Sequence, residues 1–289
     1  MILKKLLAAI TGKQNPAELR VELPTGEKGT VESITHDGLL RVTLDGNEDK
    51  QKYMGDPEKT EIVYGLLGVP HEERDDQWGE ALLANLADAN MDGGSSSRPV
   101  EMEGPDGFPY ICLSSPEPNK VYRAWVIRHI LPNLLEDTCG VVINPGKGQP
   151  DWVLSFGDIV NFHLNGAFRT DDDRFDKFDD CAPASEEVGE GGESVLEGDP
   201  SPDMLPPQVR AVLRRFLEAY DFPPKVKLMH REAKPEAGRK GGLSLIFPFT
   251  EKNEQDAKTI QYVSRAVRWF LPRHYSVLWM RGDEGFYDL

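Results

Sequence analysis

The chain has 289 residues, of which 39 % are hydrophobic and 28 % charged, and its net charge is −16 at pH 7. This length predicts two or three domains. The acidic surplus argues against general nucleic-acid binding, which needs clustered Lys and Arg to displace counterions from phosphates. Three cysteines without a CxxC pair favour a reducing, cytoplasmic location, and no apolar run approaches the roughly 20 residues of a membrane span.

Residues 1–68 predict an N-terminal helix followed by a small β region. Apolar residues in the first ten positions follow helical spacing. The runs LRVEL, GTVESIT, LLRVTLD and TEIVYGLL are rich in β-branched residues, and His36-Asp37-Gly38 is a hairpin signal between two of them. The GTVESITHDGLLRVTL stretch resembles the small SH3-like barrels of some RNA-associated proteins. That resemblance keeps RNA association open as an alternative.

Residues 69–168 predict an α+β module, in which helices and strands alternate along the chain. Two local features make sharper predictions. Pro132 should kink or end the second helix near Leu131, whereas Ser155 followed by Asp158 predicts a capping box at the last helix. The expected elements are a helix over 72–90, strands over 100–103 and 108–113, a helix over 119–136, the strands CGVVINP and DWVLSF, and the helix GDIVNFHLNG.

Residues 169–205 predict an acidic linker. Between 171 and 200 there are 12 acidic and 2 basic residues, mixed with Gly, Pro and Ser. Low hydrophobicity combined with high charge is typical of a disordered or loosely held segment. The aspartates of this segment do not complete an EF-hand loop, because Phe175 stands at the third ligand position.

Residues 206–289 predict a second α+β module, with 15 basic and 10 acidic residues. Its first helix shows apolar residues at i, i+3, i+4, i+7, i+8 and i+11, the strongest helical pattern in the chain. Both modules share the order helix, strand, strand, helix, strand, which we interpret as an internal duplication. The elements expected after the first helix are strands over 226–230 and 243–249, a helix over 254–270 ended by Pro272, and the strand YSVLWMR.

The sequence contains none of the catalytic or phosphate-binding motifs that would define a site. GxSxG and HExxH are absent, and neither NPGKGQP nor AGRKGG completes a phosphate loop. We therefore assign no catalytic, cofactor-binding or metal-binding residue and expect no cofactor. A hydrolase or transferase whose site converges from dispersed groups stays open as an alternative, with the candidates Glu101, Glu103, Asp106, His163 and His274.

A partner-binding site is predicted in the RAVRWFLPRHY stretch. Arg and Trp are the residues that dominate interaction hot spots, and two of the arginines are one helical turn apart, so that they share one helix face. The candidate partner-binding residues are Arg265, Arg268, Trp269, Arg273 and His274.

The helix and strand order of the middle module resembles type III secretion chaperones and related bacterial regulatory proteins, and GVVINPGKGQPDWVLSFGDIV is similar to a segment of SseB-like proteins. The resemblance implies an acidic, non-enzymatic, cytoplasmic bacterial protein. Composition and resemblance together predict an α+β fold and a non-catalytic interaction or regulatory protein, chaperone- or adaptor-like. Its partner would be a protein of unknown identity rather than nucleic acid, and a homodimer is left open.

Overall fold

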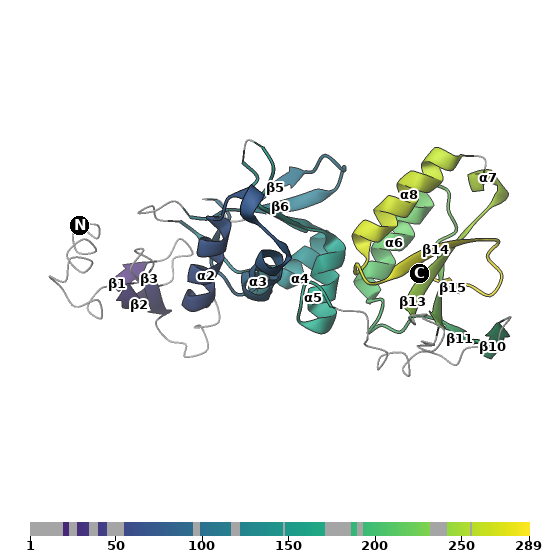
Figure 1. The fold of residues 1–289 in the computed structure, drawn as a ribbon, viewed down its shortest axis with the longest axis horizontal. Helices are drawn as coiled ribbons and strands as arrows, with labels where there is room; N and C mark the ends of the chain where they lie inside the picture. Colours follow the sequence, from purple (N-terminus) through teal and green to yellow (C-terminus); the bar gives the residue numbers. More distant parts are fainter. Residues whose placement is uncertain are drawn as a thin grey trace. The chain divides into compact units, whose positions relative to one another are not determined.

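The computed structural model of the chain has the α+β fold that the sequence predicts (Figure 1). It describes residues 20–22, 28–34, 40–44, 55–94, 99–116, 122–146, 148–170, 186–189, 193–231, 242–254 and 256–289. The chain divides into two compact units. The first consists of Met1–Met102, Ile111–Ile130 and Val142–Trp152, and the second of Glu103–Tyr110, Leu131–Val141 and Val153–Leu289.

The predicted β region begins with three antiparallel strands, β1 (Arg20–Glu22), β2 (Lys28–Ile34) and β3 (Leu40–Leu44), in the order β1-β2-β3. They confirm the first three predicted strands. The expected N-terminal helix and the His36-Asp37-Gly38 turn lie outside the described residues.

The fourth predicted strand, TEIVYGLL, is wrong, because the segment belongs to helix α2 (Pro57–Leu67). The carboxylate of Asp56 accepts hydrogen bonds from the backbone amides of Glu58 and Lys59 and so caps the helix, and Pro57 stands at the first helical position. Thr60, Val63 and Leu67 are buried at helical spacing. Burial of this stripe, together with the cap, outweighs the weak strand preference of the β-branched residues.

The next helix, α3 (Asp76–Leu86), begins later than predicted, after the short 3₁₀ helix η3 (His71–Glu73). The side chain of Asp75 caps α3 by accepting a hydrogen bond from the amide of Trp78. A two-residue ladder follows between the short strands β4 (Met91–Asp92) and β7 (Ala124–Trp125).

The second predicted helix also begins later, as α4 (Ile127–Asp137). Pro132 lies inside α4, so the helix does not end near Leu131, and the alternative of a kink at Pro132 stays a prediction. Ile127, Ile130 and Leu134 are buried along the same face. Their packing outweighs the roughly 3 kcal/mol that an interior proline costs.

A four-stranded sheet has the order β5-β6-β8-β9. The helix α5 (Phe156–Asn165) follows it and shows the predicted capping box: Ser155 accepts from the amide of Asp158, and the Asp158 carboxylate accepts from the amide of Ser155. The strands are β5 (Val100–Glu103), β6 (Pro109–Leu113), β8 (Gly140–Ile143) and β9 (Trp152–Leu154).

The last sheet has the order β10-β11-β12-β13-β14, and the short C-terminal strand β15 also pairs with β12. β10 and β11 fall in the segment predicted as a loose linker, so that prediction is wrong for these residues. Backbone pairing of β11 with β12 supplies a partner that composition cannot reveal. The strands are β10 (Glu186–Gly189), β11 (Glu193–Gly198), β12 (Lys225–Arg231), β13 (Gly242–Phe249), β14 (Ser276–Arg281) and β15 (Tyr287–Asp288).

Three helices accompany this sheet: α6 (Pro207–Ala219), α7 (Glu251–Glu254) and α8 (Ala257–Phe270) (Figure 1). α8 connects the parallel neighbours β13 and β14, as a crossover helix does. Elements of the predicted types occur in both modules, with α3, β5, β6, α4 and β8 corresponding to α6, β12, β13, α8 and β14, but the additional elements β4, β7 and α7 interrupt the predicted order. Duplication itself remains a prediction.

Candidate functional site

The outer edge of the last sheet is formed by β14, which follows β13 at the end of the strand order. No described strand pairs with the outer edge of β14. Leu278 and Met280 stand on one face of the strand and are 39 % and 43 % exposed, while Val277, on the opposite face, is buried. The register places Leu278 beside Ile246 and Trp279 beside Phe247. β14 therefore offers unpaired backbone groups next to exposed apolar side chains.

The helix α8 has α6 as its neighbour on one flank. One flank of α8 faces α6: Tyr262 lies 5.3 Å from Tyr220 and 6.5 Å from Phe216, measured between ring centroids. The C-terminal end of α6 is next to β12, because only Pro223 and Pro224 separate Phe222 from that strand. The other flank of α8 is therefore on the side of the free edge of β14.

Trp269, a predicted partner-binding residue, is instead buried inside the second unit. Its indole stacks on Phe108 with a centroid distance of 4.1 Å, and its Nε1 donates to the Tyr110 hydroxyl at 2.7 Å. That hydroxyl in turn donates to the Asp106 carboxylate at 2.6 Å. Burial, followed by the hydrogen bond to Asp106, raises the pKa of Tyr110 above its ordinary value. Trp269 is therefore not a surface residue, because another segment of the same unit covers its ring.

Arg273 likewise serves the second unit. Its guanidinium binds the buried Asp158 carboxylate through two hydrogen bonds, of 2.7 and 2.9 Å. This contact holds the loop after α8 against the start of α5, where a Cβ added to Gly157 would stand 1.9 Å from the Leu271 carbonyl oxygen. Glycine is required at 157 because the two backbones meet there.

Arg265 and Arg268 remain exposed on α8, as predicted, and neither forms an ion pair with a described carboxylate. His274 is half-buried, with its Nδ1 3.3 Å from the Thr170 hydroxyl and its ring against Tyr275. Two of the five predicted partner-binding residues, Arg265 and Arg268, are therefore exposed to solvent without a described carboxylate as a partner.

The residues of the enzyme alternative lie in different surroundings. Glu101 and Glu103 are exposed on β5, and His163 is exposed near the end of α5. Asp106 accepts from Tyr110 and from the amide of Phe108, whereas His274 contacts Thr170. None of these contacts joins two of the candidates, and a site assembled from them stays a prediction.

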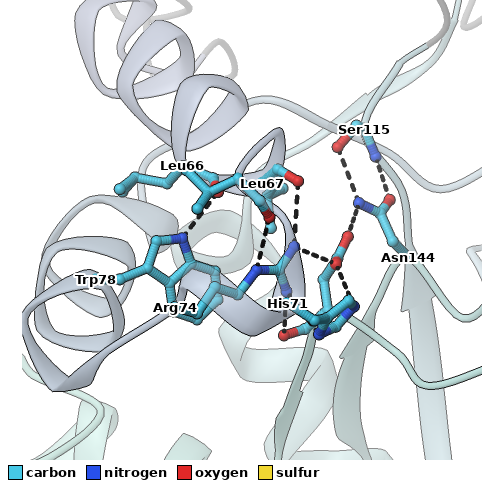
Figure 2. A network of polar contacts seen from close by, with 9 residues as sticks. Leu66, Leu67, His71, Arg74, Trp78, Ser115 and Asn144 are labelled. Carbon is cyan, nitrogen blue, oxygen red and sulfur yellow. Dashed lines mark hydrogen bonds and ion pairs between the residues drawn. The ribbon is translucent and has the colours of Figure 1, made fainter.

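A second polar cluster lies in the first unit, where Arg74 is almost buried with a side-chain exposure of 8 %. Its guanidinium donates to Asp151 at 2.7 Å and to the carbonyls of Leu67 and Val69, and it lies 4.5 Å from the ring centroid of Trp78 (Figure 2). The Trp78 indole donates to the Leu66 carbonyl at 2.8 Å. Arg74 thus connects the segment between α2 and α3 to the loop before β9.

Asp151 is the acceptor at the centre of this cluster. It also binds the Asn144 amide nitrogen at 2.6 Å and His71 Nε2 at 3.2 Å, and the Asn144 amide continues to the Ser115 hydroxyl at 3.0 Å (Figure 2). Although Ser, Asp and His are all present, Asp151 stands between the other two instead of orienting the His toward the Ser. His71 Nδ1 is 3.2 Å from the Arg74 guanidinium, so both ring nitrogens face protein groups. This arrangement is a structural clamp, unlike a nucleophile and base in direct contact.

The first unit also contains an aspartate with a strongly lowered pKa. Asp88 contacts Arg128 and Lys59, and hydrogen bonding to Arg128, opposed in part by burial, lowers the pKa of Asp88 to about 2. This carboxylate is held in its charged form and is therefore a structural anchor.

In the part of the chain that the structure describes, no three His, Cys, Asp or Glu side chains gather as metal ligands would. The described helices also include none with the length and apolar character of a membrane span. Comparison with protein-family models, curated proteins and solved structures gives no match for this chain.

Sequence reasoning identified β14 as a strand but missed Leu278 and Met280 as surface residues. The segment YSVLWMR is continuously apolar from Val277 to Met280, a pattern that equally fits a strand buried on both faces. The position of β14 at the edge of the sheet follows from the strand order, which the apolar pattern of the segment does not reveal.

Proposed function

We propose that this protein is a non-catalytic interaction or regulatory protein, which binds an extended segment of a protein partner by adding it as a strand to β14. The observation that carries the proposal is the apolar outer edge of β14, with Leu278 and Met280 both more than a third exposed. The acidic composition and the absence of a CxxC pair support a cytoplasmic, chaperone- or adaptor-like role.

An open edge of this kind is unusual in natural sheets, because unpaired N–H and C=O groups invite association with other chains. Natural edges are protected by charges, by prolines or by short length. The four-residue edge strand β5 follows that rule, since Glu101 and Glu103 alternate along it. β14 has six residues, and its one charged residue, Arg281, is the last of them. An added strand would satisfy its backbone groups and cover its apolar side chains, as in other cases of β-strand addition.

Selection of random dodecapeptides displayed on phage against the full chain tests the proposal. We expect enriched peptides, whose binding protects the β14 amides from hydrogen exchange and is lost in Leu278→Lys, because a charged side chain at 278 would meet the added strand. Ile62→Lys is the matched control, since Ile62 is 41 % exposed on α2. The proposal fails if no peptide is enriched, or if Leu278→Lys binds the enriched peptides as well as the unchanged protein does.

A further inference from the structure

We propose that the partner strand runs antiparallel to β14 and places two apolar side chains, two residues apart, opposite Leu278 and Met280. This inference rests on the proposed function. It adds the direction of the ligand strand, the positions of its apolar residues and the backbone groups of β14 that bind it.

One hydrogen bond at the end of β14 fixes the direction in which its backbone groups point. The amide of Gly282, the residue directly after β14, donates to the carbonyl of Phe249 in β13 at 3.0 Å. In a strand, the N–H and C=O of one residue point to the same side, and successive residues point to opposite sides. Met280 and Leu278 therefore direct their backbone groups toward β13, as Gly282 does.

The same alternation leaves the N–H and C=O groups of Val277, Trp279 and Arg281 at the outer edge of the sheet. Among the described residues, none outside the sheet forms a backbone hydrogen bond with these groups. The binding edge therefore consists of three donors and three acceptors, spaced two residues apart.

Pro248 in β13 agrees with this assignment. Because its backbone points away from that of Phe249, which faces β14, Pro248 is directed toward β12. Proline has no N–H to donate to a neighbouring strand. The pairing of β13 with β12 accordingly ends at Ile246, whereas the pairing of β13 with β14 continues to Phe249.

The exposed side chains of β14 alternate with these outward backbone groups. An antiparallel strand would hydrogen-bond to Val277, Trp279 and Arg281, so that Leu278 and Met280 would stand in non-hydrogen-bonded pairs. The Cα atoms of such pairs are about 4.5 Å apart, against about 5.5 Å in hydrogen-bonded pairs, and their side chains are closer. Apolar ligand residues at these two positions would cover the exposed side chains closely. Parallel pairing is slightly less stable per residue, so both effects favour the antiparallel direction.

The two directions differ in which ligand amides point to β14. In antiparallel addition these amides belong to the residues on either side of each apolar position, opposite Val277, Trp279 and Arg281. In a parallel pair, directly opposite residues direct their backbone groups the same way, as Phe249 and Arg281 do. The amides that point to β14 in parallel addition would therefore belong to the apolar positions themselves.

The test uses a dodecapeptide enriched on the full chain, in which each residue is N-methylated in turn or replaced by alanine. N-methylation should weaken binding about tenfold at alternate residues, because it removes a donor and leaves a carbonyl of β14 unpaired. Alanine should weaken binding about fivefold at the residues between them. In Leu278→Ala the alanine effect at the facing ligand residue should shrink, whereas the matched control Ile62→Ala should keep it.

Hydrogen exchange of single amides in the free protein tests the backbone assignment independently of any peptide. The amides of Leu278 and Met280 should exchange slowly, because they bond to β13. Those of Val277, Trp279 and Arg281 should exchange fast and become slow when the peptide binds.

The outcomes that overturn the inference differ from those that overturn the proposed function. If the N-methyl-sensitive residues are also the alanine-sensitive ones, or if the five amides exchange equally fast in the free protein, the antiparallel register is rejected and strand addition stands. A peptide that binds but tolerates N-methylation at every residue rejects strand addition, and both proposals with it. The absence of any enriched peptide rejects both as well.

Discussion

Replacement of Gly157 by alanine is the sharpest test of the second unit. Gly157 is the second residue of α5, and a Cβ at this position would lie 1.9 Å from the carbonyl oxygen of Leu271 and 2.4 Å from its carbonyl carbon. Non-bonded heavy atoms prefer separations of roughly 3.5 Å. The methyl group can therefore be accommodated only if the backbone at 271 moves away from α5 by more than about 1 Å.

Two costs and one gain set the size of the effect. Overpacking of a fitted contact costs about 1–3 kcal/mol. The displaced backbone also carries Arg273, two residues further on, away from the buried Asp158 carboxylate. Loss of a partner from a buried charge costs about 3–5 kcal/mol, of which water recovers a part because half of the Arg273 side chain is exposed. Alanine gains about 0.5–1 kcal/mol over glycine in a helix. We expect a net loss of about 2–4 kcal/mol.

Urea-induced unfolding of the full chain measures this loss, with Gly65→Ala as the matched control. Gly65 is exposed in α2, and a Cβ there would meet no atom within 4 Å. The same substitution should therefore stabilise the first unit by about 0.5–1 kcal/mol. If Gly157→Ala unfolds at the same urea concentration as the unchanged protein, the close approach between α5 and Leu271 is refuted.

Three further substitutions test the polar and aromatic contacts. Asp151→Ala should destabilise the first unit by about 3 kcal/mol, because it leaves the buried Arg74 guanidinium without its counter-charge; a loss below about 1 kcal/mol in urea unfolding would contradict the clamp. Trp269→Ala should lower the free energy of unfolding by about 3–5 kcal/mol. Trp269→Phe keeps an aromatic ring against Phe108 but loses the hydrogen bond to Tyr110, so it should lower the free energy of unfolding by about 1–1.5 kcal/mol. Equal losses in the two variants would contradict the burial of the indole. Asp88 has a folded pKa of about 2, below its ordinary 3.8, so its ion pairs add stability above about pH 4 that is lost as the pH falls toward 2. Asp88→Asn should lower the free energy of unfolding by about 1 kcal/mol at pH 7 after allowance for solvent screening. Calorimetry should find that the stabilities of the variant and of the unchanged protein converge near pH 2. A difference in stability that does not change with pH would refute the lowered pKa of Asp88.

The sequence alone determined those elements whose signals are local. The capping box of Ser155 and Asp158 satisfies helix amides within four residues, so it could be predicted without knowledge of any neighbour. The apolar stripe of α6 and the α+β class follow for the same reason, because periodicity records which face each element buries. That Arg265 and Arg268 share one helix face was also predictable from their spacing.

Only the tertiary structure decided the features that depend on pairing between distant segments. TEIVYGLL is β-branched yet helical, since the Asp56 cap and the burial of Val63 outweigh a weak local preference. β11 is acidic yet ordered, since β12 pairs with it. Trp269 looked like a surface hot spot, but Phe108 and Tyr110 cover it. The same cause explains the candidate site: whether Leu278 and Met280 are buried or exposed depends on strand order, and strand order arises from non-local contacts that no short stretch of sequence contains.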